Sequence, residues 1–345
     1  MGSVFRYSGL TTKVRAMRGR LLTKEEYKIM SNMSSVAEVI NMLKERKSYM
    51  DIFEGKDPEY IHRGELEKLM LCSKYIDFEK LYRFANSSQR PYLKLYFIKY
   101  EIDIIKKAIV HLDNPNQREF YNDFDKIVGK YPDIDIAKVC NASNMDELIE
   151  AVKGSIFFNT IQMVRNCENA KAFDYEVALD LFFFTYVWKK RKKFFKGDDL
   201  ENVSKIYGTE SDILNIMWIH RTKEYYKLKK EQIYSMVIPV YYKLKKEQIR
   251  QLVEVEGEDA FWGVVESSYY GKLLKKEEFN SANIGKIFDE YLRRCYHKLF
   301  KINPYSLSAL TAYLRDKEAE IKKIVTVAES IRYGYSSEDI LKRLR

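Results

Sequence analysis

Glycine and proline are scarce in this sequence. Its 345 residues include only 14 Gly and 6 Pro, so few positions favour tight turns. Long stretches rich in Lys, Glu, Leu, Ile and Tyr run between them, a composition typical of helices. The sequence therefore predicts an all-α protein, and its length suffices for two or three domains of ordinary size.

Cysteine and histidine are also rare, with four residues of each. No two cysteines have C-x-x-C spacing, and the histidines are equally dispersed. A structural zinc site needs clustered ligands, and a disulfide framework needs a higher density of cysteine. We therefore expect four buried free thiols in a reducing compartment, and no metal site.

Long apolar runs are missing as well. No run approaches the roughly 18 to 20 residues that cross a bilayer as a helix. The most apolar segment, 179–188, contains Asp180 and ends at the basic run 189–193. The N-terminal segment has basic residues without a continuous apolar core after them, which argues against a signal peptide. These features predict a cytoplasmic protein.

Motifs that mark nucleotide binding or catalysis are absent. The sequence has no G-x-x-x-x-G-K-[ST], G-x-G-x-x-G, G-x-S-x-G or H-E-x-x-H. Glu318 and Glu320 lie two residues apart in a predicted helix and therefore point to different sides. Such acids are far more often solvated helix charges than a general acid and base. The sequence indicates neither an enzyme nor a cofactor.

A short helical pattern recurs three times. Glu318-Ala319-Glu320-Ile321 lies in a predicted helix over 314–332, which has one apolar stripe. Its counterparts at 101–104 and 210–213 are separated by 109 residues, and the second precedes Glu318 by 108. Because any helical protein offers chance amphipathic matches, four residues alone are a weak basis for a repeat.

A second pattern has the same period. The segment that begins at Met30 and ends at Tyr49 resembles the segments 139–157 and 252–270. Two unrelated patterns at one spacing favour a repeated unit over chance similarity. We therefore predict three helical repeat units of ordinary domain size. They are residues 1–114, 115–226 and 227–345.

Between the second and third units, nine residues recur identically. Residues 225–233 reappear as 241–249, with Pro239 between the copies. A proline inside a helix costs about 3 kcal/mol, so we expect two short helices with a bend. The second copy aligns with a predicted helix start at Thr23, where Thr23 is part of a capping box. Lys245 replaces that threonine, and the lost cap would cost on the order of 1 kcal/mol.

The net charge is +10, from 60 basic and 50 acidic side chains. Such an excess can favour an anionic partner, but dense mixed charge is also typical of long solvated helices, the interpretation we favour. The run 189–193 precedes Phe194 and Phe195. Cations beside aromatic rings suit RNA or lipid, although a charged helix end beside the core is the simpler interpretation.

Three groups of residues together resemble a known family. They are Tyr7 with Val14-Arg15-Ala16-Met17-Arg18 and Arg20-Leu21-Leu22; Trp218-Ile219-His220-Arg221-Thr222-Lys223-Glu224-Tyr225-Tyr226 followed by Ile238-Pro239; and Tyr313-Leu314-Arg315-x-Lys317-Glu318-x-Glu320-Ile321. Over essentially the whole chain they resemble the C subunit of archaeal and bacterial A/V-type ATPases, which is homologous to the d subunit of eukaryotic vacuolar ATPases. The family usually has glycine after its Ile-Pro, whereas Val240 follows Pro239 here. This departure leaves the geometry of the link open.

The resemblance implies a funnel of three similar helical domains around a pseudo-threefold axis. It implies a non-catalytic socket of the central stalk, which receives the tip of the rotating shaft and passes torque to the membrane rotor ring. The implied partners are the central shaft subunits and the proteolipid ring, with no nucleic acid. The chain is expected to be a monomer in isolation and, in the complex, peripheral on the cytoplasmic face of the membrane.

Four arginines lie beside the motifs that carry the resemblance. We expect Arg15, Arg18, Arg20 and Arg221 on partner-facing or cavity surfaces, and intramolecular ion pairs are the alternative. The competing function is a soluble α-helical repeat scaffold that binds RNA or acidic proteins. Salt-sensitive retention of polyanions without affinity for a rotor shaft would favour that scaffold.

Overall fold

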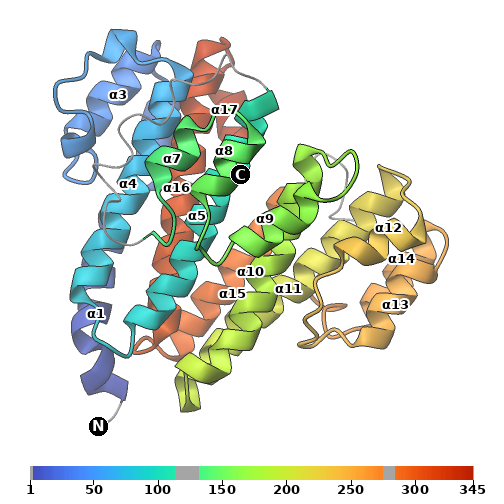
Figure 1. Cartoon of the computed structure of the whole chain (residues 1–345). Coiled ribbons are helices and arrows are strands. Elements are labelled where there is room, and N and C mark those ends of the chain that lie inside the picture. Colours follow the sequence, from blue (N-terminus) through green and yellow to red (C-terminus); the bar gives the residue numbers. More distant parts are fainter. Residues whose placement is uncertain (1–2, 114–131, 275–283, 345) are drawn as a thin grey trace. The chain divides into compact units, whose positions relative to one another are not determined.

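The structure, a computed structural model, describes residues 3–113, 132–274 and 284–344 (Figure 1). These residues form 16 α-helices and two short 3₁₀ helices, and no strand occurs among them. The prediction of an all-α protein is therefore confirmed. The described residues fall into two compact units. Unit 1 lies within Met1–Lys94, Val110–Ala151 and Ala309–Arg345, and unit 2 within Leu95–Ile109 and Val152–Ser308.

The predicted boundary at residue 114 lies outside the described residues. The division of the chain into three repeat units stays a prediction. Two helices contribute residues to both compact units: α5 (Arg90–Asp113) and α16 (Leu307–Arg332). Together with α11 (Gly197–Glu224) they are the longest helices, and each carries one copy of the pattern found at Glu318.

Unit 1 begins with α1 (Ser3–Arg18), which packs on α4 (Arg63–Phe84). The other complete elements of unit 1 are α2 (Lys24–Ser31), α3 (Val36–Lys44), η1 (Met50–Ile52), η2 (Pro58–Tyr60), α7 (Ile136–Asn141), α8 (Met145–Ala151) and α17 (Ser337–Leu344). The predicted capping box starts α2, because the Thr23 hydroxyl accepts from the Glu26 amide while the Glu26 carboxylate accepts from the Thr23 amide. Residues 85–89 separate α4 from α5.

The helix predicted over 314–332 begins earlier, at Leu307. After a run of buried residues over 309–314, its buried positions recur every three or four residues, the spacing of one helix face. These positions include Ile324, Val327 and Ala328, but also the charged residues Lys317 and Glu320. The buried face of α16 is thus not the purely apolar stripe that the sequence predicted.

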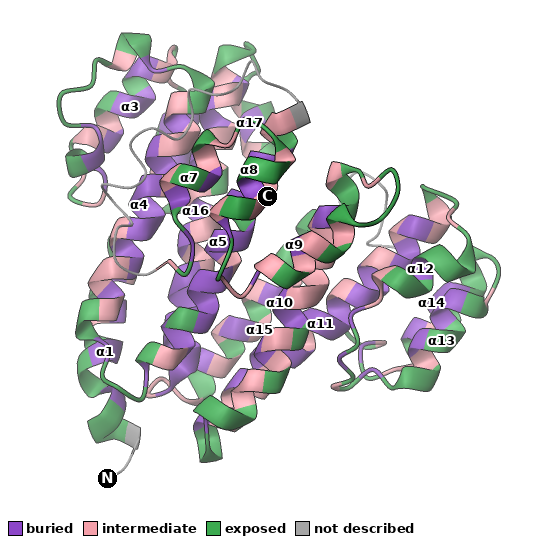
Figure 2. Ribbon diagram, viewed as in Figure 1, coloured by how far each residue is buried: buried purple, intermediate pink, exposed green. Residues whose placement is uncertain are grey.

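Unit 2 is built around α11, which contacts α10 (Ala172–Phe194), α15 (Ile284–Ile302) and the shorter helices α12 (Lys230–Met236), α13 (Lys246–Glu254) and α14 (Glu258–Ser267). The remaining helix, α9 (Phe158–Arg165), packs on α10. Figure 2 shows buried residues along α11, whereas α13 and α14 keep an exposed face. This core position explains why α11 can carry the buried polar residues Glu210, Asp212 and Asn215, which form hydrogen bonds with neighbouring elements.

The two identical nine-residue segments have different backbones at their first four residues. In the first copy Tyr225 ends α11 and Lys227 has a positive φ of 49°. In the second copy 241–244 is an irregular segment that leads into α13. The last five residues of both copies start a helix in the same way. The amides of Lys229 and Lys245 each donate to the glutamine side chain three residues later. That glutamine supplies one half of a capping box, in which the side chain three residues on accepts from the N-cap amide; a threonine hydroxyl would supply the other half by accepting from the amide three residues later.

The link between α12 and α13 contains the Ile-Pro pair. The buried side chain of Asn215, on α11, donates to the Ile238 carbonyl at 2.9 Å and accepts from the Ile238 amide at 2.8 Å. This pair of hydrogen bonds fixes the backbone just before Pro239, so that α12 and α13 are separate helices as predicted. A glycine after the proline is not required for this geometry.

All four cysteines are free, but the prediction that all are buried was wrong. Cys72 is buried, Cys167 is exposed, and Cys140 and Cys295 are intermediate. Cys140 lies on the short helix α7, Cys167 follows the end of α9, and Cys295 lies on α15, so residue type alone did not predict their exposure.

Candidate functional site

A buried carboxylate of unit 2 holds the start of α13. Asp212 lies on α11 and is completely buried. Its oxygens accept from the backbone amides of Lys243 at 2.7 Å, Leu244 at 2.9 Å and Tyr242 at 3.3 Å, and from the Tyr270 hydroxyl at 2.9 Å. Burial raises the pKa of Tyr270 above its ordinary range, so this hydroxyl stays protonated and donates.

A corresponding carboxylate of unit 1 holds the start of α2. Glu320, on α16, is buried and accepts from the Leu22 amide at 2.5 Å. It also accepts from the Tyr49 hydroxyl and from the Lys317 ammonium, the latter at 3.1 Å. Burial raises the pKa of Tyr49, and the negative charge of Glu320 raises it further. The phenol therefore remains a donor.

The two arrangements match through the internal repeat. Glu320 follows Asp212 by 108 residues, the same spacing as in the repeated pattern. Leu22 and Leu244 occupy equivalent places before the helix starts, and Tyr49 and Tyr270 end equivalent segments. In both copies, a carboxylate on a long helix therefore binds the amide at a helix start and the tyrosine that follows the next helix. We call each arrangement a helix-start clamp.

The third arrangement that the repeat would place, Asp103 with Phe157, lacks this clamp. The position equivalent to Asp212 is Asp103, whose side chain is exposed on α5. The aromatic position is Phe157, which is buried against Phe182 and has no hydroxyl to donate. This arrangement thus lacks the hydroxyl, and its carboxylate is exposed to solvent instead of buried.

A buried lysine completes the clamp of unit 1. The Lys317 side chain is 1% exposed, and its ammonium donates to the Tyr49 hydroxyl at 2.8 Å. A second carboxylate, Asp77 of α4, lies 3.8 Å from the ammonium and accepts from the Tyr313 hydroxyl at 2.5 Å. One buried cation thus faces two carboxylates and two phenols. The prediction that Glu320 is a solvated helix charge was wrong.

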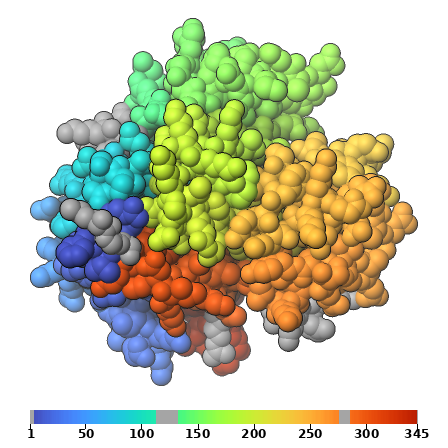
Figure 3. Space-filling view, turned by 90° about the horizontal axis from the view of Figure 1, so that it is seen from below, coloured from blue at the N-terminus to red at the C-terminus, as the bar shows by residue number. Residues whose placement is uncertain are grey.

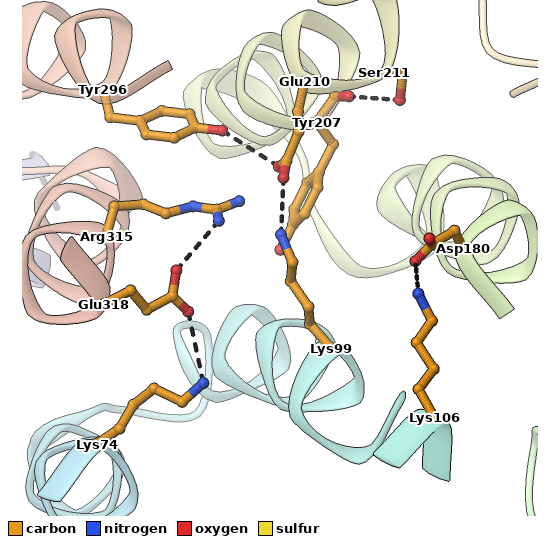
Figure 4. A network of polar contacts seen from close by, with 10 residues as sticks. All are labelled: Lys74, Lys99, Lys106, Asp180, Tyr207, Glu210, Ser211, Tyr296, Arg315 and Glu318. Carbon is orange, nitrogen blue, oxygen red and sulfur yellow. Dashed lines mark hydrogen bonds and ion pairs between the residues drawn. The ribbon is translucent and has the colours of Figure 1, made fainter. Parts of the chain in front are cut away.

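The first acid of the repeated pattern also pairs with a lysine. In unit 2, Glu210 accepts from Lys99 of α5 at 2.8 Å and from the Tyr296 hydroxyl of α15 at 3.3 Å (Figure 4). In unit 1, Glu318 accepts from Arg315 at 3.2 Å and lies 3.9 Å from the Lys74 ammonium of α4 (Figure 4). These pairs connect long helices within each unit, and breaking one would leave a charge in a low-dielectric site.

Another acid of unit 2, Asp180, is half-buried and paired with a lysine. The Asp180 carboxylate of α10 accepts from the Lys106 ammonium of α5 at 2.6 Å (Figure 4). Burial raises the pKa of Asp180, while the charge of Lys106 opposes that rise. The pair joins α5 to α10 as the Lys99 pair joins α5 to α11.

The four predicted arginines fall in different environments. Arg15 and Arg20 are exposed, and neither has an ion-pair partner among the residues that the structure describes. Arg18 is half-buried and pairs with Asp316 of α16 at 3.1 Å. These three belong to unit 1, whereas Arg221 belongs to unit 2 and donates to the Tyr226 hydroxyl at 3.4 Å. Of the four arginines, Arg18 therefore forms the intramolecular ion pair that was the alternative to a partner-facing surface.

No group of three or more His, Cys, Asp and Glu side chains in 3–113, 132–274 and 284–344 is placed to hold a metal ion. Within the same residues, every helix is too short or too polar to cross a membrane. The oxygens of the two clamps are occupied by donors from the chain itself, so their function is to hold helix starts in place.

The fold and these contacts define an all-helical protein in which buried charges tie long helices together. A family model, ATP synthase (C/AC39) subunit, matches residues 10–343. The chain belongs to this family.

Curated relatives agree over nearly the whole chain. The C subunit of the A-type ATP synthase of Methanosphaera stadtmanae is 25% identical over 335 residues, which cover 94% of this chain and 84% of that protein. The protein of the same name from Thermococcus kodakarensis is 20% identical over 343 residues, which cover 97% of this chain and 89% of that protein. The C subunit from Methanothermobacter thermautotrophicus is 21% identical over 359 residues, which cover 99% of this chain and 88% of that protein. The family resemblance predicted from the sequence is confirmed.

Proposed function

We propose that this chain is a non-catalytic central-stalk subunit of a V/A-type rotary ATPase. It acts as a socket that couples the rotating shaft subunits to the membrane rotor ring, for ATP-driven ion transport or for ATP synthesis. The observation that carries this proposal is the family match over residues 10–343. In the complex the chain lies on the cytoplasmic face of the membrane, and in isolation it is a monomer.

The internal repeat supports the proposed architecture. Three similar helical domains around a pseudo-threefold axis would form a funnel, with one long helix from each domain. The helices α5, α11 and α16 carry the three copies of the repeated pattern, and two copies have the same helix-start clamp. A part that transmits torque has to resist bending, and buried charge pairs between long helices oppose relative sliding within each unit.

Two of the four arginines are the best candidates for partner contact. Arg15 and Arg20 are exposed and have no carboxylate partner among the described residues, so their charges are available to an acidic surface. Arg18 and Arg221 are held by contacts within the chain, and they would support the surface that Arg15 and Arg20 present.

The test is co-purification with the rest of the enzyme. A tagged chain should retain both the shaft subunits and the proteolipid ring from solubilised membranes. The Arg15→Glu/Arg20→Glu variant should lose one of these partners. The matched variant Lys28→Glu/Lys47→Glu, which reverses two exposed charges of the same unit, should keep both. Full assembly of the arginine variant would refute the role of these residues, and absence of both partners from the wild-type chain would refute the socket.

The second candidate function is a soluble α-helical repeat scaffold that binds RNA or acidic proteins. It is favoured by the net charge of +10 and by the exposed lysines at the end of α10. Salt-sensitive retention of polyanions by the purified chain, without retention of the shaft, would decide for this function.

A further inference from the structure

An exposed apolar side chain ends the helix that precedes each long repeat helix. Phe84 is the last residue of α4, Phe194 of α10 and Ile302 of α15. Their exposed fractions are 57%, 40% and 72%. They lie 110 and 108 residues apart, close to the period of the repeat. Single exposed apolar residues are ordinary, but recurrence at one place in three copies is not.

The fold does not need these side chains at the surface. Next to Phe194, the side chain of Phe195 is 2% exposed and anchors the end of α10 in the core. Next to Phe84, Ala85 is 3% exposed in the same manner. In these two cases the buried neighbour closes the helix end.

Basic side chains surround each exposed residue. The segment 189–196 has six basic residues and no acidic one. The Lys13 ammonium lies 4.7 Å from the centre of the Phe84 ring. Exposed lysines without an ion-pair partner in the described part of the chain flank the other two positions. They are Lys192, Lys193 and Lys196 beside Phe194, and Lys298 and Lys301 beside Ile302.

Two of the three positions belong to unit 2. The end of α10 and the end of α15 are both at the lower end of this unit in Figure 1. Seen from below in Figure 3, the yellow-green turn between α10 and α11 and the orange-red turn after α15 are both at the surface. The two basic and apolar patches therefore face the same side of unit 2.

We infer that these helix ends bind the headgroup surface of an anionic lipid membrane. Lysines close to such a surface are attracted by lipid phosphates, and an apolar side chain among them enters the boundary between headgroups and acyl chains. Single-stranded nucleic acid would instead require flat rings on which bases stack. Ile302 cannot stack, whereas all three side chains can enter a lipid interface. The recurrence of an aliphatic residue in place of phenylalanine thus favours lipid.

This inference does not rest on the proposed function, because it concerns the isolated chain. The test is flotation of the purified full chain with vesicles of phosphatidylcholine alone or mixed with phosphatidylglycerol. We expect binding to the mixed vesicles that weakens as salt is raised. The variant Lys192→Gln/Lys193→Gln/Phe194→Ser should bind about 30-fold more weakly from its two charges alone, since each lysine contributes about fivefold. Loss of Phe194 should weaken binding further.

A matched control removes the same chemistry elsewhere in unit 2. Tyr241, Lys245 and Lys246 are exposed, and Tyr241→Ser/Lys245→Gln/Lys246→Gln should leave vesicle binding within about twofold of wild type. The emission of Phe194→Trp should shift to shorter wavelength with mixed vesicles and stay unchanged with phosphatidylcholine. Equal binding by the two triple variants would overturn the inference. So would retention of single-stranded RNA without any vesicle binding, which would assign the patches to a nucleic acid.

Discussion

Removal of the Asp212 carboxylate should destabilise unit 2 more than any change on its surface. Four donors converge on this side chain, and two of them, the Leu244 amide and the Tyr270 hydroxyl, are buried. In Asp212→Ala the amides of Tyr242 and Lys243 can turn to water, because both are only partly buried. The two buried donors lose their acceptor. At about 1 to 3 kcal/mol for each unsatisfied group, the variant should lose about 4 kcal/mol of unfolding free energy.

A double-mutant cycle makes the estimate sharper. Tyr270→Phe removes one donor and should cost about 1 to 2 kcal/mol by itself. In the Asp212→Ala background the same change removes a hydroxyl that already lacks its partner, so its cost should fall to nearly zero. The coupling between the two residues is therefore expected to be about 1 to 2 kcal/mol.

Tryptophan fluorescence during urea unfolding is the assay for this cycle. All three tryptophans, Trp188, Trp218 and Trp262, belong to unit 2, so their emission reports on this unit. Glu201→Ala is the matched control, because Glu201 is an exposed acid of the same helix paired with Lys205, and its loss should leave the unfolding free energy of unit 2 close to that of the wild-type chain. A loss below about 1 kcal/mol for Asp212→Ala, or equal costs of Tyr270→Phe in both backgrounds, would refute the clamp.

Three further predictions concern buried groups. Lys317→Met should cost about 3 to 5 kcal/mol by denaturant unfolding, because it leaves the Glu320 carboxylate buried without its cation. Burial lowers the pKa of His220, so on acidification the unfolded chain takes up a proton that the folded chain excludes. The free energy of unfolding should therefore fall as pH drops below about 6.5, and His220→Leu should flatten that pH dependence. Gly208→Ala would place a Cβ 2.5 Å from the Tyr242 ring. The variant should lose about 1 to 3 kcal/mol of unfolding free energy, measured by thermal unfolding.

Local signals predicted the helices well. The Thr23 capping box and the separation of α12 from α13 at Pro239 both depend on residues within one or two turns. The chemistry of proline and of helix caps acts over that same distance. These features are therefore visible in any short window of the sequence.

Burial of charge was not predictable in this way. Glu320 looks like a solvated helix acid because its partners, Leu22 and Tyr49, are almost 300 residues away in the chain. The repeat held the missing signal, since Leu22 aligns with Leu244 and Tyr49 with Tyr270. A polar residue kept at one place in two copies indicates a shared buried contact.

The duplicated nine residues show a second limit of local reasoning. Tyr225 to Leu228 and Tyr241 to Leu244 are identical in sequence, yet only the second segment donates its amides to Asp212. The position of Asp212 selects the backbone of the second copy. Tertiary contacts thus override local preference, which is the same in both segments.

ATP-driven ion transport in membranes tests the proposed coupling most directly. Membranes from cells that lack this chain should transport few ions when ATP is added, because the shaft no longer drives the ring. Addition of the purified chain should restore transport, and addition of the Asp212→Ala variant should restore less when it is assayed near its unfolding midpoint. Undiminished transport without the chain would contradict its role as the socket between shaft and ring.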